Sequence, residues 1–344
     1  MISVQDMTTT ALRALERAGV PPGHARTQLS LLLDAELSGV SSHGLLRLPR
    51  VIERIANGVT NPETRGKGEW RGQSLWQVDG QQGLGPVVAQ AALGRICQRA
   101  RKNGVAAAAI RNCDHLGMLA WYAEQVAARG QILIAMTVSE ALVHPWGGRH
   151  AMLGTNPIAI GVPAHPEPFV FDMATSLVSM GRIHDHANRD QPIPEGWALD
   201  RSGNPTTDAH AAKAGAIAPF GGAKGYALGL AFELLITSLT GAAIGTDVTG
   251  TLDNNTACNK GDMFIVLEPM GGMTHTVSRF LDALRESAPA DPSQPVRIPG
   301  ERARASRAAR ATGSLTLPPD VLGRIQALAG APRPTDTKET PDAH

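Results

Sequence analysis

The spacing of apolar residues predicts a helical start to the chain. In residues 8–18, Leu12 and Leu15 lie on one side of a helix, and Pro21-Pro22-Gly23 ends it and begins the next. That second helix extends through HARTQLSLLLDAELSGV, whose apolar residues recur at helical spacing. LPRVIERIANG predicts a third helix, ended by Gly58. Residues 60–74 are polar and rich in glycine, and we interpret them as a linker.

From about Leu75 onward, predicted helices alternate with predicted strands. The helices are PVVAQAALGRICQRARKNG, MLAWYAEQVAARG and GYALGLAFELLITSLTG, and the strands are VAAAAIRN, QILIAMTVS and DMFIVLEP. This alternation indicates an α/β core, in which the strand order can be mixed. Residues 187–215 are polar and rich in turn formers, which predicts a surface loop.

Composition excludes several classes of protein. Of 344 residues 42% are hydrophobic and the net charge is +1, which argues against nucleic acid or an anionic membrane as partner. Cys97, Cys113 and Cys258 are scattered without a CxxC pair, which favours a reducing compartment over a disulfide framework. The first residues lack the apolar core of a signal peptide, and no apolar run has the ~18–20 residues that a membrane span needs. We therefore expect a cytoplasmic protein.

The stretch SSHGLLRLPR, residues 41–50, is the first candidate for chemistry. At helical spacing His43 and Arg47 share one face and converge on one small object. A histidine beside a guanidinium suits a small carboxylate with a reacting carbon next to it. On these ten residues alone, the favoured interpretation is a helix capped by Ser41 or Ser42 with a surface arginine.

Four further stretches depart from simple core filling. NCDHLGML places His115 and Gly117 at the end of a predicted strand, where α/β folds bind ligands, although Asp114 and His115 also suit a helix cap. HPWGGRHAMLGTNPIAI combines glycine turns with the hydrogen-bonding side chains of Thr155 and Asn156, or is a purely structural double turn. PFGGAKGYALG sets Lys224 at a helix start, which suits a phosphate. RIPGERARAS is a weak candidate by itself.

Other familiar motifs are missing. No GxGxxG occurs, and GLGPVV at 83–88 lacks the third glycine, which argues against an ordinary Rossmann site. GxxxxGK[ST] and GxSxG are absent too. If residues 184–186 (HDH) form a strand, their two histidines lie on one face, but no third metal ligand accompanies them. We therefore predict no metal site.

Taken in order, SHG-LLR, DHLGMLAWYAEQVAARG, GGRHAMLGTNPIAIGVP, FDMATS, GGAKGYALGLAFELL and PGERA resemble the malate/L-lactate dehydrogenase-like family. This family includes sulfolactate and ureidoglycolate dehydrogenases and reductases of cyclic imines. The resemblance covers about residues 5 to 330. It implies a non-Rossmann nicotinamide-binding α/β fold of the L-sulfolactate dehydrogenase type, with a mixed sheet and a helical N-terminal region. It also implies a homodimer.

The resemblance assigns a domain plan. Residues 1–74 are expected to form an N-terminal helical region that contributes to the substrate site, and residues 75–290 the α/β dinucleotide-binding core. Residues 291–330 are expected to pack back near the cofactor, and residues 331–344 to be a disordered tail, since they are poor in apolar residues.

The resemblance also implies roles near the reacting carbon. His43, supported by Ser42, and His115 match the two family histidines, and we favour His115 as proton donor for hydroxy-acid chemistry with His43 as its partner. Arg47 matches the carboxylate anchor and Thr155 a substrate-contacting threonine. Gly181 and Arg182 match a substrate stretch in which lysine is common, so Arg182 is a candidate for holding a second anionic group.

For the cofactor, the resemblance points to six segments. The matching residues are His115, Leu116, Gly117, Met118, Leu119, Ser139, Glu140, Met173, Ala174, Thr175, Lys224, Gly225, Pro299, Gly300, Glu301, Arg302, Ala303, Arg304 and Ala305. Glu140 ends a predicted strand, where a carboxylate can bind the ribose diol and repel a 2′-phosphate. We therefore expect NAD to be preferred, with NADP as the alternative.

Three readings of function remain open at this stage. The first is hydride transfer to or from a small 2-oxo or 2-hydroxy acid such as malate, lactate or 3-sulfolactate. The second is reduction of a cyclic imine carboxylate such as Δ1-pyrroline-2-carboxylate or its piperideine counterpart. Imine-reducing members resemble a Ser-His-Asp relay, and in GRIHDH only Asp185 could supply the acid, so the hydroxy acid is favoured. The third is a nucleotide-binding protein without catalysis.

Overall fold

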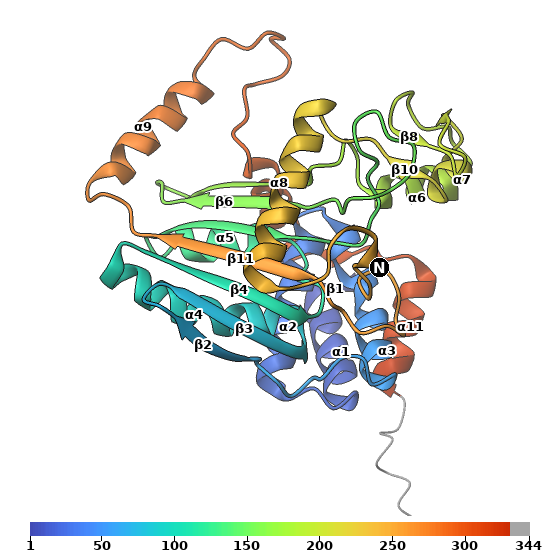
Figure 1. Ribbon diagram of the computed structural model, residues 1–344, viewed down its shortest axis with the longest axis horizontal. Coiled ribbons are helices and arrows are strands. Elements are labelled where there is room, and N and C mark those ends of the chain that lie inside the picture. Colours follow the sequence, from blue (N-terminus) through green and yellow to red (C-terminus); the bar gives the residue numbers. More distant parts are fainter. Residues whose placement is uncertain (331–344) are drawn as a thin grey trace, which may run out of the picture.

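The computed structural model describes residues 1–330, and its centre is a seven-stranded mixed sheet (Figure 1). The strand order is β2-β3-β4-β11-β5-β6-β7. Strands β3 and β4 pair in parallel, and every other pairing in this sheet is antiparallel. The predicted α/β architecture with a mixed sheet is therefore confirmed.

The strands of this sheet are β2 (Lys67–Arg71), β3 (Leu75–Gly83), β4 (Val105–Cys113), β5 (Ile132–Thr137), β6 (Ile158–Val162), β7 (Phe169–Met173) and β11 (Gly261–Leu267). The helices are α1 (Val4–Arg17), α2 (Pro22–Leu37), α3 (Leu48–Ala56), α4 (Gly85–Asn103), α5 (Ala120–Ala127), α6 (Met180–Asn188), α7 (Ala209–Lys213), α8 (Ala223–Thr240), α9 (Met273–Arg285), α10 (Glu301–Arg310) and α11 (Pro319–Gly330).

Side chains that alternate along the strands separate the two faces of the sheet. Ala108, Phe264 and Val266 belong to the large cluster that contains α4 and α5. Met136 and Met263 face the opposite way and pack with α8. Because both faces are covered, the inner strands are apolar along their whole length, which is why they were recognisable in the sequence.

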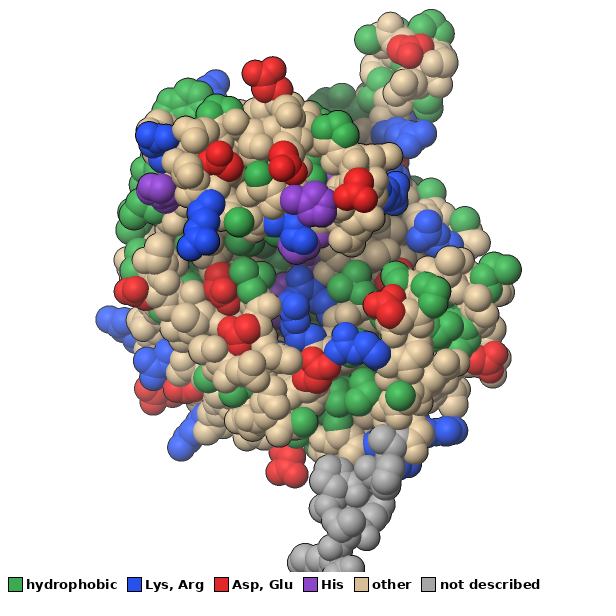
Figure 2. All heavy atoms as spheres, turned by 90° about the vertical axis from the view of Figure 1, so that its right-hand side faces the viewer, with side chains coloured by type: hydrophobic (Ala, Val, Ile, Leu, Met, Phe, Trp, Pro, Cys, Tyr) green, Lys and Arg blue, Asp and Glu red, His purple; other side chains and the backbone are tan. Residues whose placement is uncertain are grey.

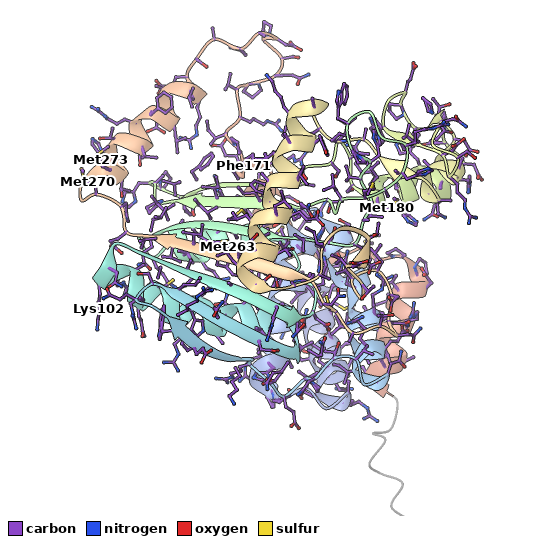
Figure 3. All side chains as sticks on the ribbon, in the orientation of Figure 1. Lys102, Phe171, Met180, Met263, Met270 and Met273 are labelled. Atoms are coloured by element: carbon purple, nitrogen blue, oxygen red, sulfur yellow. The ribbon has the colours of Figure 1, made fainter. Side chains whose placement is uncertain are left out.

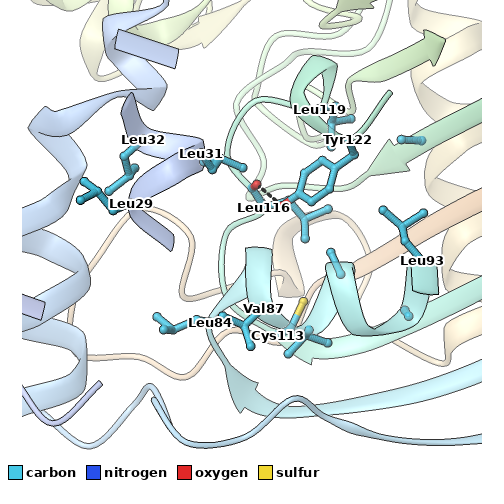
Figure 4. Packing of buried hydrophobic residues seen from close by; sticks show 14 of the residues in the cluster. Leu29, Leu31, Leu32, Leu84, Val87, Leu93, Cys113, Leu116, Leu119 and Tyr122 are labelled. Carbon is cyan, nitrogen blue, oxygen red and sulfur yellow. Dashed lines mark hydrogen bonds between the residues drawn. The ribbon is translucent and has the colours of Figure 1, made fainter. Parts of the chain in front are cut away.

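The N-terminal helices and the end of the described chain pack together beside this sheet. Helices α1, α2, α3 and α11 contact one another, and short strands β1 (Ile2–Ser3) and β12 (Ser314–Leu315) pair antiparallel. Figure 4 shows leucines of α2 facing the turn around Leu116, whose carbonyl accepts a hydrogen bond of 2.6 Å from the hydroxyl of buried Tyr122. The same core thus carries both the N-terminal region and the turn at the end of β4.

Three local predictions were wrong. The linker at 60–74 contains β2, whose exposed and half-buried residues alternate as on a sheet edge. The loop at 187–215 contains the short strands β8 (Ala198–Leu199) and β9 (Pro205–Thr206) and helix α7, and with β10 (Ala216–Ile217) and α6 it forms a small core of its own. The HDH sequence lies in helix α6, not in a strand. The predicted tail at 331–344 lies outside the described residues.

Candidate active site

The turn that carries His43 connects α2 to α3. It consists of two short 3-10 turns, Ser41–His43 and Leu45–Arg47, separated by Gly44 in an extended conformation. The regular helix expected for this stretch is therefore absent, and His43 and Arg47 approach each other through the turn. The Nε of Arg47 donates a hydrogen bond of 2.6 Å to the carbonyl of Ser42, which holds the guanidinium beside the histidine.

A buried carboxylate, Glu36, fixes the shape of this turn. It accepts hydrogen bonds from the Ser41 hydroxyl (2.9 Å) and from the backbone N–H of Leu45 (3.0 Å), one on each side of His43. A Cβ at Gly44 would lie 2.2 Å from its Oε2 atom, so only glycine fits there. Glu36 is thus the residue that orients the His43 turn.

His115 lies in the turn after β4. The backbone N–H of Gly117 donates a hydrogen bond of 2.9 Å to its Nδ1 atom. Neutral His115 therefore carries its proton on Nε2. Gly117 adopts a φ of +75° and packs against Leu31, which excludes a side chain there. The ring centroids of His43 and His115 are 5.4 Å apart, so the structure brings the two predicted histidines together.

Asp114, next to His115, is part of a buried clamp. Its carboxylate accepts hydrogen bonds from Arg54 (2.8 Å to Oδ1, 3.3 Å to Oδ2) and from the hydroxyl of Thr60. The Nη1 atom of Arg54 donates hydrogen bonds to the carbonyls of Asp253 (3.0 Å) and Thr256 (3.1 Å). Asp114 therefore acts structurally, joining the end of β4 to α3 and to the 253–256 loop.

A second buried ion pair lies on the other side of the same strand end. Lys260 and Asp262 are both buried and pair with each other. The thiol of Cys113 donates to Oδ2 of Asp262 over 3.1 Å, and burial raises the pKa of this thiol well above its ordinary value. The end of β4, directly before His115, is thus tied to two buried ion pairs through Asp114 and Cys113.

Both histidines are neutral in this environment. Burial, and secondly the charge of Arg47, lowers the pKa of His43 to about 3. Burial lowers the pKa of His115 well below 6.5, and Arg47 adds to the effect. Burial, with Arg50 as the second cause, lowers the pKa of Arg47 to about 10, so Arg47 stays charged at neutral pH.

Predicted residues at the ends of β5, β6 and β7 also meet. The backbone N–H of Thr155 donates to the hydroxyl of Ser139 (3.0 Å), and the Thr155 carbonyl accepts from the N–H (2.8 Å) and hydroxyl (3.0 Å) of Thr175. Buried Glu233 supports this cluster by accepting a hydrogen bond of 2.6 Å from the amide of Asn156. Segments 139, 155 and 173–175 therefore form one surface.

Helix α8 begins beside this surface. Gly229 approaches Thr175 so closely that a Cβ would lie 2.8 Å from its hydroxyl. Gly222 is the N-cap of α8, it has a φ of +63°, and no side chain caps the helix. The exposed Lys224 follows in the first turn. Free N–H groups at a helix start beside a lysine suit a phosphate, so these residues fit the pyrophosphate of a dinucleotide.

The remaining predicted residues occupy different surroundings. Gly300 packs on the backbone of Val170 in β7, and Arg304 donates to the carbonyl of Pro168 (3.1 Å), so segment 299–305 lies against β7. Gly181 lies beside Ser42. A Cβ added at Gly181 would lie 3.3 Å from the Cβ of Ser42. The guanidinium of Arg182 lies 5.1 Å above the ring of Trp197.

Glu140 is bound to the protein itself. Its Oε1 atom accepts hydrogen bonds from the N–H groups of Thr251 (2.7 Å) and Leu252 (2.9 Å) and from the Thr251 hydroxyl (3.1 Å). One of its two oxygens therefore holds the 251–252 segment.

Two pockets meet at Arg47 and Arg50. The first encloses about 490 Å³, including space open to solvent, and its lining includes His115, Arg54 and Thr251. The second lies between α3 and the 252–254 loop and also includes Arg324. His43 lines neither. Figure 2, which views the side of the molecule that carries α3 and α11, shows basic and histidine side chains gathered in a hollow in the middle of that face.

The supporting residues were missed by the sequence analysis. Glu36, Arg54, Glu233, Lys260 and Asp262 are charged yet buried, and each lies in or beside an otherwise ordinary helix or strand. For most of them the partner is far away in the sequence, so no local spacing could indicate it. The one available signal was a charge among apolar neighbours, as in LAFELLI and KGDMFIV.

Comparisons with known proteins agree with this site. The model of the malate/L-lactate dehydrogenase family matches residues 2–326. The crystal structure of a dehydrogenase from Sinorhizobium meliloti is 52% identical, with a TM-score of 0.91 over 94% of this chain and 96% of that one. Sulfolactate dehydrogenase from Methanocaldococcus jannaschii is 34% identical, with a TM-score of 0.89 over 98% and 100%, which confirms the predicted fold type.

A third relative is the (2R)-3-sulfolactate dehydrogenase (NADP(+)) of Chromohalobacter salexigens. It is 35% identical over 336 residues, which are 96% of this chain and 98% of the relative. The family match over nearly the whole described chain excludes a chance resemblance of single motifs. The chain therefore belongs to the malate/L-lactate dehydrogenase family and is a dehydrogenase of that family.

Proposed function

We propose that this dehydrogenase transfers a hydride between a nicotinamide dinucleotide and a small 2-oxo or 2-hydroxy acid of the malate, lactate or 3-sulfolactate type. The observation that carries the proposal is the meeting of His43, His115 and Arg47. Arg47 is charged and, within residues 1–330, donates through Nε alone, so the outer edge of its guanidinium can receive a carboxylate in two parallel hydrogen bonds. Two histidines then flank the carbon next to that carboxylate.

When bound, the dinucleotide supplies or accepts the hydride at C2 of the acid. Reduction of a 2-oxo acid leaves an alkoxide, which takes one proton to become the hydroxyl, and oxidation releases that proton. His43 suits this transfer because the Ser42 hydroxyl, 3.1 Å from its Nδ1, can either donate or accept a hydrogen bond. The neutral imidazole of the empty site can thus take the proton that oxidation releases, and the Ser42 hydroxyl is a suitable partner of Nδ1 before and after this transfer.

His115 suits a different role. Its Nδ1 accepts the Gly117 N–H, and a second proton at that atom would face this donor directly. The ring is therefore suited to remain neutral and to donate a hydrogen bond from Nε2 to the substrate oxygen. This division reverses the preference for His115 as proton donor that the sequence suggested.

The direct test is consumption of NADH by the purified protein with oxaloacetate, pyruvate, 3-sulfopyruvate and Δ1-pyrroline-2-carboxylate. We expect turnover of at least one 2-oxo acid, and loss of turnover but retained NADH binding in the Arg47→Met variant. Turnover of the imine alone would assign the chain to imine reduction. That result is not expected, because Asp185, the one acid available for a relay, is exposed and pairs with Arg189 at 3.1 Å.

For the cofactor, we propose a preference for NAD over NADP through Glu140. The Glu140→Gln variant tests this preference. Its amide oxygen can still accept the hydrogen bonds from the 251–252 segment, while the charge that would repel a 2′-phosphate is gone. We expect kcat/KM for NADPH relative to NADH to rise up to about 5-fold, because one exposed charge contact contributes up to about 1 kcal/mol. An unchanged ratio, with an unchanged unfolding temperature, would contradict the role.

We further propose a homodimer in the cytoplasm. Leu234 and Leu235 of α8 are 50% and 41% exposed, and Phe280 of α9 is 64% exposed. Helix α9 stands away from the body in Figure 1, and Met270 and Met273 lie at its start in Figure 3. Apolar side chains in such number fit a second copy of the chain. Light scattering should give twice the mass of one chain, and a monomer would refute this.

The three cysteines are buried, and no disulfide joins them within the described residues. In the same part of the chain, no helix is long and apolar enough to cross a membrane.

A further inference from the structure

Arg50 is a cation without a counter-charge at the mouth of the candidate site. Its side chain is exposed, and within residues 1–330 it forms neither a hydrogen bond nor an ion pair. It nevertheless lines both pockets that meet beside Arg47. An arginine that only solubilises the surface has no reason to occupy the lining of a pocket that also contains His115.

The helix explains why Arg50 faces the same way as Arg47. Arg47 is the N-cap residue of α3 and already has helical dihedral angles, and Arg50 follows three positions later in the first turn. Residues at this spacing are neighbours on one helix face. Arg54, one turn further on, lies on that face too and lines the first pocket. Three arginines therefore follow one another along one face of the same pocket.

The carboxylates around this face are already committed. Asp114 neutralises Arg54 at 2.8 Å. Glu53 pairs with Arg324 and accepts a hydrogen bond of 3.0 Å from the Asn254 amide. Asp253 accepts the backbone N–H groups of residues 255 and 256, both at 2.7 Å. Within residues 1–330, neither Arg47 nor Arg50 pairs with any of these carboxylates, and the groups that line the two pockets carry a net positive charge.

We propose that Arg50 binds a second anionic group of the substrate. The acid that this site takes is then a dianion, with a carboxylate or sulfonate in addition to the carboxylate held by Arg47. The inference rests on the proposed function and deepens it by naming the substrate class. The two guanidinium groups repel each other in the empty site, where Arg50 contributes to the lowered pKa of Arg47. A bound dianion removes this repulsion, whereas a monoanion leaves one cation unpaired.

The test compares matched substrates in matched variants. NADH oxidation is measured with oxaloacetate and 3-sulfopyruvate as dianions and with pyruvate as the monoanion, in the wild type and in Arg50→Gln, Arg50→Lys and Arg26→Gln. In Arg50→Gln we expect kcat/KM to fall about 10- to 100-fold for the dianions, as expected for loss of a hydrogen bond between charged groups, and to stay unchanged for pyruvate. Arg50→Lys should recover most of the loss.

Arg26→Gln is the matched control, because Arg26 is also exposed but lines neither pocket. This variant should leave the kcat/KM values for the dianions relative to pyruvate unchanged. An equal loss for pyruvate and the dianions in Arg50→Gln would overturn the inference, as would a changed KM for NADH alone, which would assign Arg50 to the cofactor. A selective loss in Arg182→Gln instead of Arg50→Gln would move the second anion to Arg182.

A binding measurement separates this inference from the proposed function. With NADH present, the unfolding temperature is measured with each of two dianions, succinate and 3-sulfopropanoate, and with the monoanion butyrate. None of these three acids can react. We expect the dianions to stabilise the wild type more than butyrate does, and this difference to disappear in Arg50→Gln. An equal effect of dianion and monoanion refutes the inference even if 2-oxo acids are reduced. An Arg50-dependent difference without any turnover supports it and refutes the proposed function.

Discussion

The two histidines that meet in the site are held in opposite ways. His43 lies in a turn shaped by side chains, since Glu36 holds the turn and the Ser42 hydroxyl faces Nδ1 at 3.1 Å. His115 lies in a turn shaped by its own backbone, where the N–H of Gly117 fixes Nδ1 as an acceptor at 2.9 Å. A hydroxyl can rotate between donating and accepting, and an amide N–H cannot.

This difference teaches that proximity of two histidines does not make them interchangeable. A proton shuttle needs an environment that accepts both of its protonation states, which the Ser42 side provides. A hydrogen-bond donor to a developing alkoxide needs one fixed tautomer, which the Gly117 side provides. The comparison gives each histidine a separate test.

The largest effect is expected when each histidine is replaced with glutamine, whose amide can donate a hydrogen bond but cannot carry the proton. His43→Gln should lower kcat about 10³-fold, within the range for loss of a general acid–base group. His115→Gln should lower it only about 10-fold, because a donor remains. Steady-state kinetics with the best 2-oxo acid measure both, and the opposite ranking would make His115 the proton carrier.

The next effect concerns stability on the His115 side. Replacing Asp262 with alanine leaves the fully buried Lys260 without its counter-charge, beside the thiol of Cys113. Breaking a buried pair in this way should reduce the free energy of unfolding by about 3–5 kcal/mol. Urea denaturation measures the change, with Asp185→Ala as the exposed control that should stay within about 0.5 kcal/mol. A small loss for Asp262 would mean that Lys260 is not charged.

A smaller effect is expected on the His43 side from Glu36→Leu. The backbone N–H of buried Leu45 then loses its acceptor, whereas the hydroxyl of the exposed Ser41 can bond to water. We expect a loss of about 1–3 kcal/mol in the free energy of unfolding, the cost of one unsatisfied buried group. Because the turn positions His43, kcat should also fall, whereas binding of NADH should not. Normal kcat in a destabilised variant would show that the turn keeps its shape without Glu36.

The two turns also show what the sequence could and could not reveal. His43 and Arg47 were singled out by an expected helical spacing, which the structure replaces with two short turns, and His115 was singled out beside Gly117 at the end of a predicted strand. Their supports were not identified, because Asp262 reaches Cys113 across 149 positions and Glu36 looks like an ordinary helical residue. Arg50 has the sequence context of an ordinary surface arginine, because only the structure shows that it lines the pockets beside Arg47.

The strands of the fold also differ in how well the sequence predicts them. The inner strands β4, β5 and β11 were predicted because burial on both faces makes each of them a continuous apolar run. Strand β2 was missed because it lies at the sheet edge with one side exposed, so KGEWR reads as polar. Strands β8, β9 and β10 have two residues each, too few for any period to show.

The smallest effect separates the histidines by pH. Burial lowers the pKa of His43 to about 3 in the folded protein, below its value near 6.5 in the unfolded chain. Between these values the unfolded state binds the extra proton, so the stability that His43 contributes is present above pH 6.5 and is lost as the pH falls toward 3. The pKa of His115 is also lowered in the folded protein, so the stability that His115 contributes is likewise lost as the pH falls.

The free energy of unfolding, measured by urea denaturation at pH 7, 6 and 5, should therefore fall less steeply in His43→Gln and in His115→Gln than in the wild type. Each variant removes at most one proton, or about 1.4 kcal/mol per pH unit. Adding succinate should reduce the difference for His43, because a carboxylate on Arg47 offsets the charge that, after burial, is the second cause of its lowered pKa. A slope that succinate leaves unchanged would mean that the anion does not bind beside His43, and the shared site of the two histidines would then have to be given up.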